Sequence, residues 1–138
     1  MITVLLADDH VMVRDGLRYL LEAAGDIQIV AMAADGKDAV TKAIVYKPNV
    51  AILDVSMPDL DGMEATQQIV RYCPNTRVLL LSMHHTAEYV QRALEVGASG
   101  YVLKDEAGYD LLLAVRALDR GSTYFSKKIA EIARTRLG

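Results

Sequence analysis

The sequence predicts an α/β protein with a doubly wound parallel sheet, because three patterns agree. Short apolar segments of strand length alternate five times with segments that have helical spacing of apolar residues. The links between them are short. The apolar segments are nearly continuous in Val, Ile and Leu, which is typical of strands covered on both faces. Together these patterns favour parallel strands joined by right-handed crossovers, with helices on both faces of the sheet.

Each predicted strand is an apolar segment rich in Val, Ile, Leu or Tyr. The second carries Gln28 and is expected to lie at an edge of the sheet. The strands are Val4–Ala7, Ile27–Ala33, Val50–Leu53, Val78–Leu81 and Tyr101–Leu103.

Each predicted helix ends near a glycine or before a proline, as helices tend to. The first places Val13, Leu17, Leu20, Leu21 and Ala24 on one face and ends at Gly25. The others are about Gly36–Tyr46 before Pro48, Gly62–Tyr72 before Pro74, Thr86–Val96 before Gly97 and Gly108–Arg120 before Gly121.

Composition fits one folded domain followed by a short tail. The chain has 138 residues, of which 52% are hydrophobic and 24% charged. We expect a domain over residues 1–121 and a connector over 122–138 that contains a helix at Lys127–Leu137. The net charge of -3 gives no reason to expect the domain itself to bind nucleic acid or an anionic membrane.

Cys73 is the single cysteine, which excludes an intramolecular disulfide and a two-cysteine zinc site. The start of the chain has no basic leader or long apolar run, so a cytoplasmic location is expected.

Polar side chains follow four of the predicted strands at their carboxyl ends. They are Asp8 and Asp9 after the first, Asp54 after the third, Ser82 after the fourth and Lys104 after the fifth. In a doubly wound sheet these ends meet at the edge where ligands bind. We therefore expect these side chains to share one site.

The chemistry of this set points to phosphoryl transfer. Three carboxylates would repel one another without a cation, and Mg2+ prefers oxygen ligands of this kind. Lys104 can pair with a phosphoryl oxygen, and the Ser82 hydroxyl can donate to another. Asp54 remains as the nucleophile that forms an acyl phosphate. Positioning and charge neutralisation are the main requirements of such a transfer.

The motifs at these positions resemble the response-regulator receiver domain of two-component systems over about residues 1–121. They are Asp8-Asp9-His10, Asp54-Val55-Ser56-Met57-Pro58-Asp59-Leu60-Asp61-Gly62, Leu81-Ser82-Met83-His84 and Val102-Leu103-Lys104. The resemblance implies the CheY-like (flavodoxin-like) fold, with five strands in the order 2-1-3-4-5, five flanking helices and a C-terminal linker helix. It also implies a phosphohistidine on a sensor histidine kinase as the phosphodonor.

The resemblance assigns a role to each site residue. Asp54 is the phosphoacceptor, and Mg2+ is held by Asp9, Asp54 and the backbone carbonyl of Ser56, with Asp8 in the acidic pocket. Lys104 and Ser82 contact the phosphoryl group, and Ser82 with Tyr101 forms the switch pair. Ser56 and His84, each two residues after a site residue, are expected to modulate the lifetime of the phosphate. Asp105 stands where many receivers have proline after the lysine, so a trans bond is expected there.

Further details resemble the NarL/FixJ (LuxR-type) subfamily. They are Asp8-Asp9-His10, Ser82-Met83-His84 and the connector Gly121-Ser122-Thr123-Tyr124-Phe125-Ser126. Such proteins usually carry a C-terminal LuxR-type helix-turn-helix domain that binds DNA, and a homodimer is expected to form on phosphorylation. This chain stops before such a domain. It is expected to be a shortened form of a longer regulator or, as the alternative, a stand-alone receiver in a phosphorelay.

Other interpretations fit the residues less well. Asp8 and Asp9 are also good helix N-caps, but the match to Asp54 and Lys104 favours an acidic pocket. A metal cluster of His10, His84 and His85 is not expected, because His84 and His85 are adjacent and oxygen ligands dominate the site. An aspartate-nucleophile phosphatase of the haloacid dehalogenase type needs a second Asp where Ser56 stands, so a switch without substrate turnover is favoured. Nucleotide-binding glycine fingerprints are absent. A receiver that signals without phosphate is disfavoured by the intact site.

Overall fold

A computed structural model gives the fold of residues 1–137. The side chains of Tyr109, Arg136 and Leu137 lie outside the described part, as does Gly138, the last residue of the predicted connector. Among residues 1–137 no peptide bond is cis, so the bond between Lys104 and Asp105 is trans, as expected.

A parallel sheet with strand order β2-β1-β3-β4-β5-β6 forms the centre of the protein. The predicted order 2-1-3-4-5 is confirmed, and β2 with Gln28 lies at the edge. A sixth strand was not predicted, because two residues are too few to show a hydrophobic period. It pairs through Gly100 with Tyr124 and Tyr101 with Phe125. The strands are β1 (Ile2–Ala7), β2 (Ile27–Ala33), β3 (Val50–Asp54), β4 (Arg77–Ser82), β5 (Gly100–Leu103) and β6 (Tyr124–Phe125).

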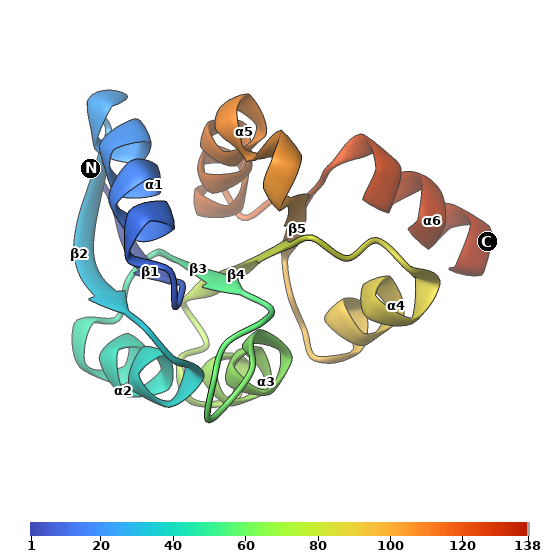
Figure 1. Ribbon diagram of the computed structural model, residues 1–138, viewed down its shortest axis with the longest axis horizontal. Coiled ribbons are helices and arrows are strands. Elements are labelled where there is room, and N and C mark those ends of the chain that lie inside the picture. Colours follow the sequence, from blue (N-terminus) through green and yellow to red (C-terminus); the bar gives the residue numbers. More distant parts are fainter. Residues whose placement is uncertain (138) are drawn as a thin grey trace.

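Helices cover both faces of the sheet, as predicted (Figure 1). Along β1 the side chains alternate, so that Leu5 and Ala7 join one buried cluster while Val4 and Leu6 join the other. The first cluster lies under α2 (Gly36–Tyr46), α3 (Gly62–Tyr72) and α4 (Ala87–Glu95), and the second under α1 (Val11–Ala23) and α5 (Ala107–Asp119). A 3-10 turn, η1 (Lys104–Glu106), leads into α5.

The C-terminal helix α6 (Lys127–Leu137) packs against the core of the sheet domain instead of leading away from it. Ile129 is fully buried in the first cluster, and α6 contacts α4, β5 and β6 (Figure 1). The Ser126 backbone N–H donates to the Tyr101 carbonyl at 3.0 Å. The predicted connector is therefore joined to β5 by strand pairing and by apolar packing.

No helix within residues 1–137 is both long enough and apolar enough to cross a membrane.

Candidate functional site

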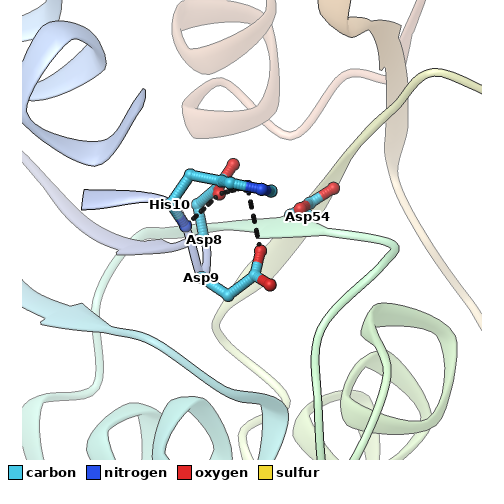
Figure 2. A group of neighbouring side chains, drawn as sticks. All are labelled: Asp8, Asp9, His10 and Asp54. Atoms are coloured by element: carbon cyan, nitrogen blue, oxygen red, sulfur yellow. Dashed lines mark hydrogen bonds and ion pairs between the residues drawn. The ribbon is translucent and has the colours of Figure 1, made fainter. Parts of the chain in front are cut away.

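The carboxyl ends of the central strands carry the predicted site residues. Asp8 follows β1 directly, Asp54 ends β3, Ser82 ends β4 and Lys104 follows β5. Asp8, Asp54 and Ser82 are buried. Figure 2 shows Asp8, Asp9 and His10 gathered beside Asp54. The sheet order brings these residues together, because β1, β3 and β4 are neighbours and β5 lies next to β4.

Lys104 joins two buried carboxylates from different strands. Its Nζ lies 3.2 Å from Asp54 Oδ2 and 3.0 Å from Asp8 Oδ2. The Asp8 and Asp54 side chains are 1% and 4% exposed, and that of Lys104 is 17% exposed. Ion pairs this far from water are weakly screened, so each charge strongly affects the others.

The protonation of the site reflects both burial and crowding of like charges. Burial raises the pKa of Asp54 above its ordinary value, and the nearby Asp8 carboxylate adds to the rise. Lys104 and the Ser56 N–H oppose this rise. Burial alone would lower the pKa of Lys104, but its bonds and attraction to Asp8 and Asp54 raise it above its ordinary value. Lys104 therefore stays charged, while the Asp54 carboxylate is held in an unfavourable environment.

The carboxylates of the acidic cluster are donors that suit a hard divalent cation. Asp8, Asp9, His10 and Asp54 each offer one ligand atom, and these atoms lie within 4.8 Å of one another. Three carboxylates outnumber the Lys104 ammonium and the Arg14 guanidinium, which donates to the Asp8 backbone carbonyl at 2.6 Å, and a divalent cation would neutralise the remaining negative charge. The predicted metal ligands Asp9 and Asp54 thus lie together and fit Mg2+.

His10 was left out of the predicted site, yet the structure places it in this cluster. Its Nδ1 lies 3.2 Å from Asp8 Oδ1 and 3.1 Å from Asp9 Oδ1 (Figure 2). The His10 backbone N–H also donates to Asp8 Oδ1 at 2.9 Å. Its position directly after two site carboxylates was the signal that could have identified it. The neighbouring α1 begins at Val11 with His10 as its N-cap, so neither Asp8 nor Asp9 caps the helix.

The loop between β3 and α3 folds back closely under Asp54. The Ser56 N–H donates to Asp54 Oδ1 at 3.4 Å, and the Ser56 side chain is exposed beside it. A Cβ at Gly62 would lie 2.4 Å from the Asp54 carbonyl oxygen and 2.8 Å from Val55 Cα. Only glycine permits this approach without a backbone shift, so Gly62 fixes the position of Asp54. This role was not predicted, although the glycine is part of the motif.

Ser56 lies at the rim of an open pocket of about 370 Å³ between this loop and α4. The pocket carries both an acidic and a basic side chain from α4. Its lining is formed by Val55, Ser56, Asp61, Met63, Glu88, Tyr89 and Arg92.

The two residues of the predicted switch pair are connected through the backbone of His84. The His84 N–H donates to Ser82 Oγ at 2.9 Å, and the Tyr101 hydroxyl donates to the His84 carbonyl at 2.6 Å. The His84 ring stacks on Tyr89 of α4, with ring centroids 4.2 Å apart. Tyr101 is fully buried, and burial raises its pKa, with the Ser82 hydroxyl opposing the rise. The Tyr101 ring therefore already lies inward in the core.

Comparison with known proteins gives a consistent result. Residues 4–116 match the family model of the response regulator receiver domain. The chain is 41% identical over 127 residues to the oxygen regulatory protein NreC of Staphylococcus aureus. This match covers 91% of this chain and 58% of NreC. This chain therefore spans 58% of the length of the curated relatives that it matches.

Solved structures agree with the sequence relatives. A LuxR-family two-component response regulator from Aurantimonas sp. SI85-9A1 has a TM-score of 0.93 and 34% identity, covering 100% of this chain and 99% of that one. The signal receiver domain of the response regulator NarL from Mycobacterium tuberculosis has a TM-score of 0.84 and 35% identity, and the match covers 87% of this chain and 97% of that one. The resemblance drawn from the motifs therefore holds for sequence and fold.

Proposed function

This chain belongs to the response regulator receiver domain family, and on that premise we propose that it is a phosphorylation-dependent switch. It accepts a phosphoryl group on Asp54 from a phosphohistidine of a sensor histidine kinase. The observation that carries this proposal is the partly buried Lys104 ammonium, which lies between the buried carboxylates of Asp54 and Asp8 at 3.2 and 3.0 Å. A cation in this position supports an incoming phosphoryl oxygen as well as the two carboxylates.

Each site residue then has a chemical task. An Asp54 carboxylate oxygen forms the acyl phosphate, while Lys104 and the Ser82 hydroxyl bind phosphoryl oxygens. Asp9 and Asp54, with Asp8 nearby and the backbone carbonyl of Ser56, would hold Mg2+. When bound, Mg2+ neutralises negative charge on the phosphoryl oxygens. Ser56, exposed beside Asp54, and His84 modulate how long the acyl phosphate survives.

The signal then passes through the backbone of His84. Phosphorylation adds negative charge and acceptor oxygens at Asp54, to which Ser82 can donate its hydroxyl proton. Ser82 Oγ accepts a hydrogen bond from the His84 N–H, so a shift of Ser82 displaces the His84 backbone. The His84 carbonyl, to which the Tyr101 hydroxyl donates, then moves as well. The movement reaches the surface formed by α4, β5 and α5. This is a local charge event acting on an element with two arrangements.

We propose that phosphorylation promotes a homodimer and controls DNA binding by a C-terminal helix-turn-helix domain, in the cytoplasm. Relatives described as LuxR-family regulators support this assignment. A stand-alone receiver in a phosphorelay is the alternative.

Labelling with acetyl phosphate and Mg2+ tests the phosphoacceptor. Mass spectrometry is expected to find one added phosphoryl group in the wild type and none in Asp54→Ala. Asp59→Asn is the matched control, because Asp59 is an exposed carboxylate in the same loop, and Asn tolerates its φ of 67°. Labelling that persists in Asp54→Ala would contradict the proposal.

The switch is proposed to have no steady turnover of external substrates. A phosphatase with an aspartate nucleophile needs a general acid where Ser56 stands. An assay with phosphate monoesters is expected to show no Asp54-dependent product beyond one equivalent. Multiple turnovers that are lost in Asp54→Ala would favour the phosphatase instead.

A further inference from the structure

The His10 imidazole faces Asp9, which would hold the divalent cation, and the neighbouring Asp8 of the acidic pocket. Its Nδ1 lies 3.1 Å from Asp9 Oδ1 and 3.2 Å from Asp8 Oδ1 (Figure 2). The Lys104 ammonium binds the other oxygen of Asp8, Oδ2, at 3.0 Å. The side of Asp8 that faces His10 is therefore the side away from the lysine.

The spacing of these three atoms fits the coordination shell of one ion. Adjacent ligands of an octahedral ion with bonds of about 2.1 Å lie about 3.0 Å apart. The two distances from His10 Nδ1 are 3.1 and 3.2 Å, and the nearest ligand atoms of all four residues, including Asp54, lie within 4.8 Å. Small shifts of the side chains would place the nitrogen and the carboxylate oxygens around a single cation.

We propose that His10 Nδ1 is a ligand of this cation, so that the site prefers first-row transition ions such as Co2+ to Mg2+. The proposal rests on the proposed function, which places a divalent cation among these carboxylates. Oxygen ligands suit Mg2+, whereas an imidazole nitrogen strengthens binding of transition ions much more than binding of Mg2+. The His10 side chain is 65% exposed, so the ring can turn toward the ion without disturbing the core.

A mixed ligand set also explains why one nitrogen lies near two carboxylates. Nδ1 offers a single in-plane site, which serves either one proton or one metal bond. As a hydrogen-bond donor it would satisfy mainly one carboxylate, whereas a shared ion would satisfy all three groups. The alternative is a positioning role, in which His10 only holds the β1–α1 loop.

Isothermal titration calorimetry of the whole chain with Co2+ and with Mg2+ separates these roles. In His10→Gln the Co2+ affinity is expected to fall by on the order of tenfold or more, since even groups that only support a ligand change metal affinity by that factor. The Mg2+ affinity is expected to change by less than about twofold. His85→Gln is the matched control, because His85 is also exposed and histidine is again replaced by glutamine.

Proton NMR of the Co2+ complex gives a second readout. A strongly shifted imidazole N–H signal is expected in the wild type and in His85→Gln, and its absence is expected in His10→Gln. Equal losses of Co2+ and Mg2+ affinity in His10→Gln, or a shifted imidazole signal that remains, would overturn the ligand role. If wild-type Asp54 is labelled by acetyl phosphate in that case, the proposed function stands. A wild type that neither binds Mg2+ nor is labelled would overturn both.

Discussion

The buried contact of α6 is best tested by replacing Ile129 with alanine. Ile129 is fully buried in the cluster that includes Val90 of α4 and Tyr101 of β5. The change removes three carbon atoms, which at about 0.8 kcal/mol per buried CH2 costs about 2.4 kcal/mol of transfer free energy. A residual cavity adds to this, within the range of about 2–5 kcal/mol that is typical of buried Ile→Ala changes. Because α6 lies at the edge of the domain and can settle inward, we expect a loss of about 2.5–3.5 kcal/mol.

Urea unfolding followed by circular dichroism measures this loss. With a slope of about 2 kcal/mol per molar urea, the midpoint should fall by about 1.3–1.8 M. Lys128→Ala is the control, since Lys128 is exposed and adjacent, and its replacement should change stability by less than about 0.5 kcal/mol. Equal midpoints for the two variants would refute the packing of α6 on the receiver and restore the view of residues 122–138 as a free connector.

Three further outcomes follow from the site. Tyr101→Phe keeps the ring but removes its hydrogen bond to the His84 carbonyl, so we expect urea unfolding to show a stability loss of about 1 kcal/mol and light scattering to show weaker phosphate-dependent dimerisation. Unchanged values for both would contradict the coupling of Tyr101 to the phosphorylation site. Gly62→Ala places a Cβ 2.4 Å from the Asp54 carbonyl oxygen, so the free energy of unfolding should fall by about 1–3 kcal/mol and acetyl phosphate labelling should slow. The control is Gly16→Ala, at an exposed helical position with open space around it, which should raise the free energy of unfolding by about 0.5–1 kcal/mol. Folding raises the pKa of Asp54, so without Mg2+ the wild type should lose stability relative to Asp54→Asn as the pH rises from about 4 through the raised pKa. If urea unfolding gave the two proteins the same pH dependence, the raised pKa of Asp54 would be contradicted.

The sequence predicted the sheet and its helices well, because the signals involved are local. Val50–Leu53 reads as a strand buried on both faces, and it is fully buried in β3. Helices that end before Pro48 and Pro74 were placed correctly, since proline restricts the residue that precedes it. The convergence of Asp8, Asp54, Ser82 and Lys104 also followed from sequence, because parallel strands present their carboxyl ends at one edge.

Other features depend on contacts between distant residues, and no local pattern reports them. The pairing of Tyr124 with Gly100 forms β6 from only two residues, held by a neighbouring strand. The burial of Ile129 depends on how α6 returns onto α4. His10 is a different case, because its position directly after Asp8 and Asp9 could have identified it, and the structure added only that its ring faces both carboxylates.

The sequence by itself therefore determined the fold class, the family and the set of strand-end residues that share one site, because hydrophobic periods and strand-end positions can be read along the chain. The tertiary structure decided how those residues are held. It placed Lys104 between two buried carboxylates, required glycine at position 62 under Asp54, and linked Ser82 to Tyr101 through His84. The physical reason is that the pKa of Asp54, the close approach of Gly62 and the inward position of Tyr101 all depend on distances and burial between separate strands and loops, which exist only once the sheet has formed.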